Sequence, residues 1–153
     1  MIDTSFGEPD AGAESASPRS SSKPAPGPLA RLHILVVDDD QDTREMLRQI
    51  LTHAGALVTT AADGESALTI LRNVSADVVI SDLSMPRHDG RWVVRNLRAL
   101  EGPQGKIPAI AVTAYRETES EADAIAAGFD VYLEKPLDFR RLIDTILRVV
   151  KQA

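Results

Sequence analysis

Three adjacent carboxylates, Asp38, Asp39 and Asp40, follow directly after the apolar run Leu32 to Val37. Carboxylates this close together repel one another unless some are protonated or a cation joins them. Mg²⁺ is the natural cation, because it accepts one or two carboxylate ligands and keeps positions open for water and a substrate phosphoryl oxygen. The sequence therefore predicts a divalent-cation site at the end of a buried strand.

Three further polar residues stand at the ends of other apolar runs. Asp82 follows "VVIS", Thr113 lies in "AVTAY" and Lys135 lies in "YLEKP". The carboxyl ends of parallel strands meet at one edge of a sheet, so we expect these side chains to join the acidic run there. Beside a cation, one carboxylate can attack phosphorus and form an aspartyl phosphate. The hydroxyl and the ammonium would then bind the remaining phosphoryl oxygens.

Such a site requires strands that deliver these residues to a common edge. Short apolar runs rich in Val, Ile and Leu predict the strands. They are Leu32–Val37, Leu57–Ala61, Val78–Ser81, Ala109–Thr113 and Val131–Glu134. Their nearly continuous hydrophobicity is typical of a parallel sheet covered on both faces, and amphipathic helical patterns separate them. The predicted fold is therefore α/β, with five βα units in a doubly wound, three-layer α/β/α sandwich.

Capping residues agree with this alternation. Asp42 and Glu45 have the spacing of a capping box and predict the start of the first helix. Gly55 and Gly128 stand where helices are expected to end. Asp138 is predicted to be the N-cap of the last helix.

Length and composition favour one domain preceded by an arm. The chain has 153 residues, 43% of them hydrophobic, which is enough for a single core. Ser17 to Pro28 is rich in Ser, Pro and Ala and lacks an apolar period, so it cannot bury enough surface to offset the entropy of ordering. We predict a disordered arm over residues 1–30 and a folded domain over residues 31–153.

Composition also argues against several classes of protein. The N-terminus "MIDTSFGEPD" lacks the basic start and apolar core of a signal peptide, and no apolar run approaches the length of a membrane span. We therefore expect a cytoplasmic protein that does not engage a membrane. The absence of cysteine excludes disulfides and thiolate metal sites. The net charge of −6 argues against nonspecific nucleic-acid binding, which needs clustered Lys and Arg.

Four segments of the sequence together resemble a known family. They are "ILVVDDD", "DVVISDLSMPRHDG", "AVTAY" and "LEKP". They are similar to the successive motifs of the receiver domain of response regulators, as in chemotaxis regulators, in the same order and at similar spacing from about Arg31 to the C-terminus. Four separate motifs in register are far more specific than one. The resemblance implies strand order 2-1-3-4-5 in a five-stranded sheet with five helices.

The resemblance also implies how the acidic residues are used. Asp38 and Asp39 would be the acidic pair that holds Mg²⁺. Asp82 would be a further metal ligand and the residue that is phosphorylated. The main-chain carbonyl of Ser84, two residues later, would complete the protein's share of the metal ligands.

Three other side chains receive roles from the same resemblance. Thr113 would be a catalytic hydroxyl that also acts in the switch, and Lys135 would be the second catalytic group. Tyr132, three residues before Lys135, would be the aromatic residue of the switch. The resemblance further implies a cis peptide between Lys135 and Pro136.

The implied function is a phosphorylation-controlled receiver of two-component signalling, either stand-alone or of the kind found in hybrid histidine kinases. A histidine kinase or a histidine phosphotransfer protein would donate the phosphoryl group, and an unidentified downstream protein would read it. The domain would not be an enzyme beyond its own phosphotransfer and dephosphorylation. It would bind neither nucleic acid nor membrane.

Two alternatives remain open from the sequence. The domain could be a phosphorelay intermediate or a phosphate sink instead of an output regulator. It could also be an Mg²⁺-dependent aspartyl-phosphate phosphatase of haloacid-dehalogenase type, which resembles D-x-D-x-T/V after the first strand. Here Asp42 stands where Thr or Val is expected after Asp38 and Asp40, and Gln41 interrupts the frame that begins at Asp39.

Overall fold

The computed structural model describes residues 27–114 and 121–152, so most of the predicted arm lies outside the described residues. The sheet contains β2 (His33–Val37), β3 (Leu57–Ala61), β4 (Val78–Asp82), β5 (Ala109–Thr113) and β6 (Val131–Glu134). The strands are all parallel and lie in the order β3-β2-β4-β5-β6. In chain order this is 2-1-3-4-5, which confirms the predicted topology.

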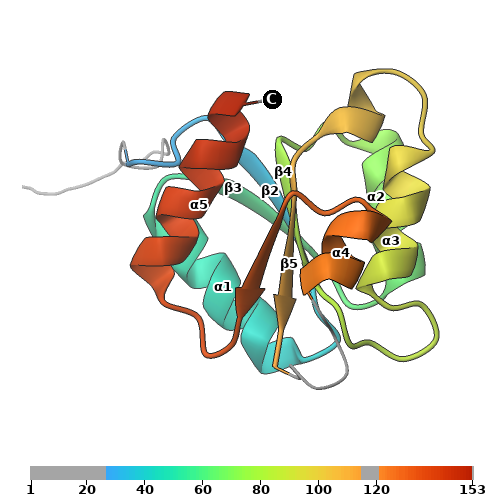
Figure 1. Ribbon diagram of the computed structural model, residues 1–153. Helices are drawn as coiled ribbons and strands as arrows, with labels where there is room; N and C mark the ends of the chain where they lie inside the picture. Colours follow the sequence, from blue (N-terminus) through green and yellow to red (C-terminus); the bar gives the residue numbers. More distant parts are fainter. Residues whose placement is uncertain (1–26, 115–120, 153) are drawn as a thin grey trace, which may run out of the picture.

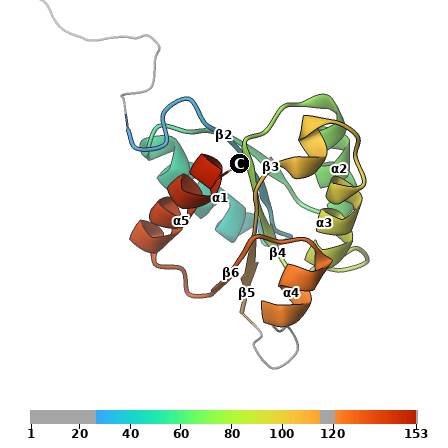
Figure 2. The same cartoon turned by 45° about the horizontal axis from the view of Figure 1, so that its top comes forward.

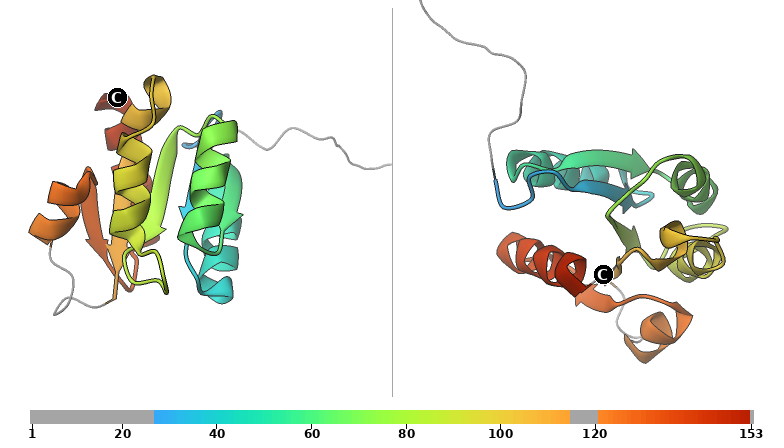
Figure 3. Two further views of the ribbon diagram at one scale, coloured as in Figure 1. Left: turned by 90° about the vertical axis from the view of Figure 1, so that its right-hand side faces the viewer. Right: turned by 90° about the horizontal axis from the view of Figure 1, so that it is seen from above.

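Helices cover both faces of this sheet. They are α1 (Gln41–His53), α2 (Gly64–Asn73), α3 (Gly90–Arg98), α4 (Glu121–Ala127) and α5 (Phe139–Gln152), with a short 3-10 helix, η1 (Pro103–Lys106), before β5. Figure 1 shows α1 and α5 on one side of the sheet, with α2, α3 and α4 on the other, and Figure 3 shows the same three layers from the side and from above. The predicted three-layer sandwich is confirmed.

Each strand supplies core residues to both layers, because successive side chains point to opposite faces. In β2, Ile34 and Val36 pack with the apolar residues of α1 and α5. Leu35 and Val37 pack instead with those of α2, α3 and α4. Both faces of the strand are therefore covered by apolar side chains, which explains why its residues are apolar at successive positions instead of alternating with polar ones.

The start of α1 differs from the sequence-based prediction. Asp40, in extended conformation, is the N-cap, and its carboxylate accepts a hydrogen bond from Thr43 N at 3.1 Å. The predicted capping box of Asp42 and Glu45 is wrong. Glu45 bonds forward to Arg48 instead of back to the helix start, and Asp42 lies in the first turn, where a negative charge favours the helix dipole.

The other predicted caps are confirmed. Gly55 and Gly128 follow α1 and α4 with φ of +107° and +129°, a conformation that side chains other than glycine rarely adopt. At Gly55 a Cβ would also lie 3.0 Å from Ala30 N. Asp138 caps α5 by accepting hydrogen bonds from Arg140 N and Arg141 N at 3.0 and 3.3 Å.

The helix α5 is amphipathic. Leu142, Ile146 and Val149 are buried against the sheet, while Arg141 and Arg148 are exposed. Its 14 residues fall short of the roughly 20 apolar residues that cross a bilayer. None of the helices in the described ranges has the length and apolar composition to cross a membrane.

The packed unit begins before residue 31, the boundary expected from the sequence. Leu29 is fully buried with the core residues of α1, and its N–H donates to Ala54 O at 2.9 Å. Figure 2 shows the segment from residue 27 passing α1 before it enters β2. One apolar residue within a Ser- and Pro-rich stretch has no periodicity of its own, so its burial depends on the end of α1 lying beside it.

We expect Leu29→Ala to lower the free energy of unfolding by about 2–4 kcal/mol, because it empties a fully buried site. Leu57→Ala is the matched control, since Leu57 is 66% exposed and its truncation should change stability by no more than about 0.5 kcal/mol. Urea denaturation of the full chain measures both. Equal, small losses would show that the segment around Leu29 is not part of the core.

Candidate functional site

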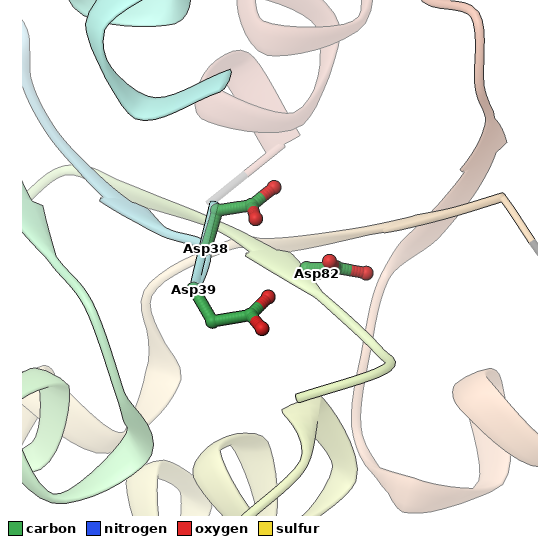
Figure 4. A group of neighbouring side chains, drawn as sticks. All are labelled: Asp38, Asp39 and Asp82. Atoms are coloured by element: carbon green, nitrogen blue, oxygen red, sulfur yellow. The ribbon is translucent and has the colours of Figure 1, made fainter. Parts of the chain in front are cut away.

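The polar residues singled out from the sequence meet at one edge of the sheet. Asp82 and Thr113 are the last residues of β4 and β5, Asp38 follows β2, and Lys135 follows β6. Figure 4 shows the side chains of Asp38 and Asp82 facing a shared space with that of Asp39. One carboxylate oxygen from each of these three aspartates lies within 4.8 Å of the others.

Lys135 bridges two of these carboxylates. Its Nζ lies 3.2 Å from Asp38 Oδ2 and 3.5 Å from Asp82 Oδ2. Burial disfavours the charged ammonium, but the carboxylates of Asp82 and Asp38 outweigh that effect and hold the pKa of Lys135 above its ordinary value. The peptide between Lys135 and Pro136 is cis, as predicted.

Backbone N–H groups hold the other oxygens of the buried pair. Asp40 N donates to Asp38 Oδ1 at 2.9 Å, and Ser84 N donates to Asp82 Oδ1 at 3.1 Å. Asp39 is exposed, and within residues 27–114 and 121–152 no group donates to its carboxylate. Among these residues, neither Asp39 oxygen is therefore occupied by a hydrogen bond.

The Asp82 carboxyl group has an unusual charge environment. It is only 8% exposed. Burial and the nearby negative charge of Asp38 raise its pKa from 3.8 to about 6, although Lys135 and the Ser84 N–H act in the opposite direction. Above that pH the carboxylate is ionised and can act as a nucleophile, at an energetic cost to the folded state that a bound cation would reduce.

Thr113 and Tyr132 occupy different depths in the sheet. Thr113 is fully buried at the end of β5, and its carbonyl accepts the Lys135 N–H at 2.8 Å. Tyr132 is half-buried on β6, opposite Ala111 in the strand register, and it packs against the core on the side of α2, α3 and α4. Thr113 thus lies at the edge of the sheet that carries the acidic cluster, whereas Tyr132 lies within β6, two residues before its end.

A glycine lets the next helix approach the strand that carries Asp82. A Cβ on Gly90 would lie 2.5 Å from Asp82 O and 3.0 Å from Leu83 Cα, closer than side chains are found. Gly90 N also donates to Leu83 O at 3.1 Å, and Asp89 caps α3 by accepting from Trp92 N at 3.0 Å. The "HDG" triplet therefore places α3 tightly against the end of β4.

Two contacts between Asp38 and the start of α1 were not predicted from the sequence. One is the Asp40 N–H on Asp38, described above. The other is Arg44, whose Nη1 donates to the main-chain carbonyl of Asp38 at 2.8 Å. In the sequence, only the position of Arg44 one helical turn after Asp40 could have indicated this contact. That position could be interpreted only once the structure showed that Asp40, and not Asp42, is the N-cap of α1.

The donor set suits a hard divalent cation. It offers oxygen atoms from three carboxylates, and among the described residues the ammonium of Lys135 compensates two of them. Oxygen-only sets of this kind suit Mg²⁺ better than softer metals, which prefer nitrogen and sulfur. The residues at this edge therefore fit the ion that the sequence suggested.

We expect Asp82→Asn to raise the free energy of unfolding of the metal-free protein at pH 8, by on the order of 2 kcal/mol, because it removes a buried charge whose pKa is raised to about 6. The folded form binds the proton of the Asp82 carboxyl group more tightly than the unfolded chain does. The contribution of this group to the free energy of unfolding of the wild type therefore rises as the pH falls from about 6 towards 3.8. Over that range the difference in stability between the wild type and Asp82→Asn becomes smaller. Urea denaturation in EDTA measures it, and an equal or less stable variant at pH 8 would contradict the charge argument.

Comparison with known proteins identifies related chains. The family model for the response regulator receiver domain matches residues 34–147. An uncharacterized 14.6 kDa protein of Leptolyngbya boryana is 43% identical over 125 residues, which cover 81% of this chain and 91% of that protein. The probable transcriptional regulator ycf27 of Cyanidium caldarium and the protein PetR of Rhodobacter capsulatus are 36% and 35% identical; both are longer than this chain, and the matches cover 47% and 51% of their lengths.

Solved structures share the fold. Chemotaxis protein CheY4 of Vibrio cholerae is 35% identical with a TM-score of 0.72, and the match covers 78% of this chain and 99% of that one. The receiver domain of a sensor histidine kinase from Pseudomonas aeruginosa is 29% identical with a TM-score of 0.73, covering 80% and 99%. That structure has a magnesium ion coordinated in its active-site cleft.

These matches give no support to the phosphatase alternative. Receiver domains are signalling modules of two-component systems, which pair them with histidine kinases. The matched region includes every strand of the sheet described above except the first residue of β2, and it includes the acidic edge. The chain belongs to the response regulator receiver domain family.

Proposed function

We propose that this domain accepts a phosphoryl group on Asp82 from a histidine kinase or a histidine phosphotransfer protein, and that the phosphorylated form signals by binding another protein. The observation that carries the proposal is the cluster of Asp38, Asp39 and Asp82 within 4.8 Å, with Lys135 bridging two of its members. This arrangement combines a nucleophile, a cation site and a positive side chain at one edge.

Asp38, Asp39 and Asp82 would hold Mg²⁺ through their carboxylates, together with the main-chain carbonyl of Ser84. When bound, the ion offsets the repulsion between these carboxylates and the incoming phosphoryl oxygens. Asp39 is the best-placed ligand, because its oxygens receive no hydrogen bond from the described residues. Asp38 and Asp82 are held in place by the N–H groups of Asp40 and Ser84.

Asp82 Oδ would attack phosphorus in line with the leaving group. The new Asp82 O–P bond forms as the P–N bond of a phosphohistidine donor breaks, and the departing imidazole takes up a proton. Lys135 Nζ already contacts Asp82 Oδ2, so it is placed to bind a phosphoryl oxygen afterwards. The hydroxyl of Thr113, at the end of the adjacent strand β5, is proposed to bind a second oxygen.

The readout of the phosphoryl group is proposed to lie on the face formed by α4, β6 and α5. One groove on this face is lined by Lys135, Tyr132 and Arg141, among others, so it runs from the acidic edge to the proposed switch residue. Residues 115–120, which precede α4, lie outside the described residues. The continuity of the groove along β6 supports a route from Asp82 to a partner surface.

We expect acetyl phosphate to label the protein only when Mg²⁺ is present, and Asp82→Asn to abolish labelling while the fold persists. The reason is that the nucleophile is lost although the rest of the cluster remains. Asp42→Asn is the matched control, because it removes one exposed carboxylate from the first turn of α1 without touching the cluster. Intact-protein mass spectrometry measures the labelling.

Two results would count against this assignment. One is equal labelling of wild type and Asp82→Asn, which would place the phosphoryl group elsewhere. The other is undiminished labelling of the wild type in EDTA, which would remove the role of the cation. A labelled wild type with a silent Asp82→Asn variant, and a control that behaves as wild type, would support the proposal.

Beryllofluoride, a phosphoryl mimic, is expected to shift the amide NMR signals of β6 and α5, and Thr113→Ala is expected to suppress those distant shifts while Asp82 stays reactive. A hydroxyl that follows the phosphoryl group is needed to carry the change from the site to Tyr132. Shifts that stop at the neighbours of Asp82 in the wild type would contradict a switch and favour a phosphorelay intermediate or a phosphate sink.

A further inference from the structure

The carbonyl of Asp38 has an unusual partner at the point where β2 leaves the sheet. The parallel ladder between β2 and β3 ends with Asp38 N donating to Ala61 O at 3.1 Å. The Asp38 carbonyl then accepts from Arg44 Nη1 at 2.8 Å. This donor comes from the second turn of α1, so it ties the helix to the acidic loop.

The bond to Arg44 fixes more than one atom. The carbonyl of Asp38 and the N–H of Asp39 belong to one planar peptide unit, so holding the carbonyl also fixes the plane from which Asp39 projects. Asp39 depends on this restraint, because its own carboxylate receives no hydrogen bond from the described residues. Asp38 and Asp82, in contrast, are each held by a backbone N–H and by Lys135.

The rest of the loop is braced from the same helix. Asp40 N donates to Asp38 Oδ1, the Asp40 carboxylate caps α1 through Thr43 N, and Arg44 N donates to Asp40 O at 3.0 Å. Arg44 therefore closes a short hydrogen-bonded circuit between the end of β2 and the start of α1.

We propose that Arg44 is a positioning residue for the cation site: it orients the peptide between Asp38 and Asp39 so that the Asp39 carboxylate faces Asp82. This inference rests on the proposed Mg²⁺ binding and adds a residue that the metal ligands alone do not include. Arg44 acts through the backbone and does not touch the ion. Partners of this kind, one bond removed from the ligands, commonly change metal affinity by about 10–100-fold.

Charge and geometry make opposite predictions for this residue. Arg44 carries a positive charge near a site for a positive ion, so Coulomb repulsion alone predicts that removing it tightens Mg²⁺ binding. Loss of the restraint on Asp39 predicts that removing it weakens binding. The sign of the change in the dissociation constant therefore separates positioning from a simple field effect.

The test titrates MgCl₂ into the metal-free full chain and into Arg44→Met, following backbone amide shifts by NMR. We expect the dissociation constant to rise about tenfold in Arg44→Met. Arg48→Met is the matched control: it removes the same charge from the next turn of α1, where Arg48 donates to Glu45 at 3.0 Å and not to the acidic loop. Its dissociation constant should stay within about twofold of wild type.

Unchanged or tighter Mg²⁺ binding by Arg44→Met would overturn the proposal, and so would an equal loss in Arg48→Met. If Arg44→Met does not fold, Arg44→Lys replaces it: the charge stays but the planar guanidinium is lost, so weaker binding supports positioning and unchanged binding refutes it. A wild type that binds no Mg²⁺ would overturn the proposed function as well. If the wild type binds Mg²⁺ and Arg44→Met binds it with the same dissociation constant, only the inference on Arg44 is overturned.

Discussion

The carboxylates of Asp38 and Asp82 are buried side by side at the end of the sheet, where like charges repel strongly. One ammonium, that of Lys135, lies 3.2 and 3.5 Å from them and keeps them together. Asp39 adds a third negative charge to the same 4.8 Å cluster. Among the described residues, the three carboxylates of the cluster therefore outnumber the one ammonium that pairs with them, and this imbalance underlies both the proposed binding of a cation and the proposed reactivity toward an electrophilic phosphoryl group.

The topology of the sheet brings these charges together. Strands β2 and β4 are hydrogen-bonded neighbours, with Val37 opposite Ser81. The next residues, Asp38 and Asp82, therefore lie about one strand spacing apart. Lys135 is 97 residues from Asp38 in the chain and reaches it because β6 runs parallel to β2 and ends at the same edge. Apolar side chains pack on both faces of the sheet and hold the strands in place. This packing keeps the carboxylates of the cluster close together despite the repulsion between them.

The same architecture offers a connection between the site and a distant face. β6 carries Tyr132 within the strand and delivers Lys135 at its end. A change in the pairing of Lys135 therefore occurs next to the groove that Tyr132 and Arg141 line. Arg44 connects the acidic loop to α1, which covers the same face of the sheet as α5. The cluster is thus braced by α1, and Lys135 also lines the groove that is the candidate interaction surface.

The sequence by itself determined the strands, because a run that is apolar at every position is stable only with both faces covered, and it located the acidic edge, because polar residues end those runs. The caps at Gly55 and Asp138 were also predictable, since they depend on local conformation. Only the tertiary structure decided that Asp40 caps α1, that Leu29 is buried and that Arg44 holds the Asp38 carbonyl. Each of these depends on which elements lie side by side after folding, and local periodicity carries no information about the spatial partner of a single residue.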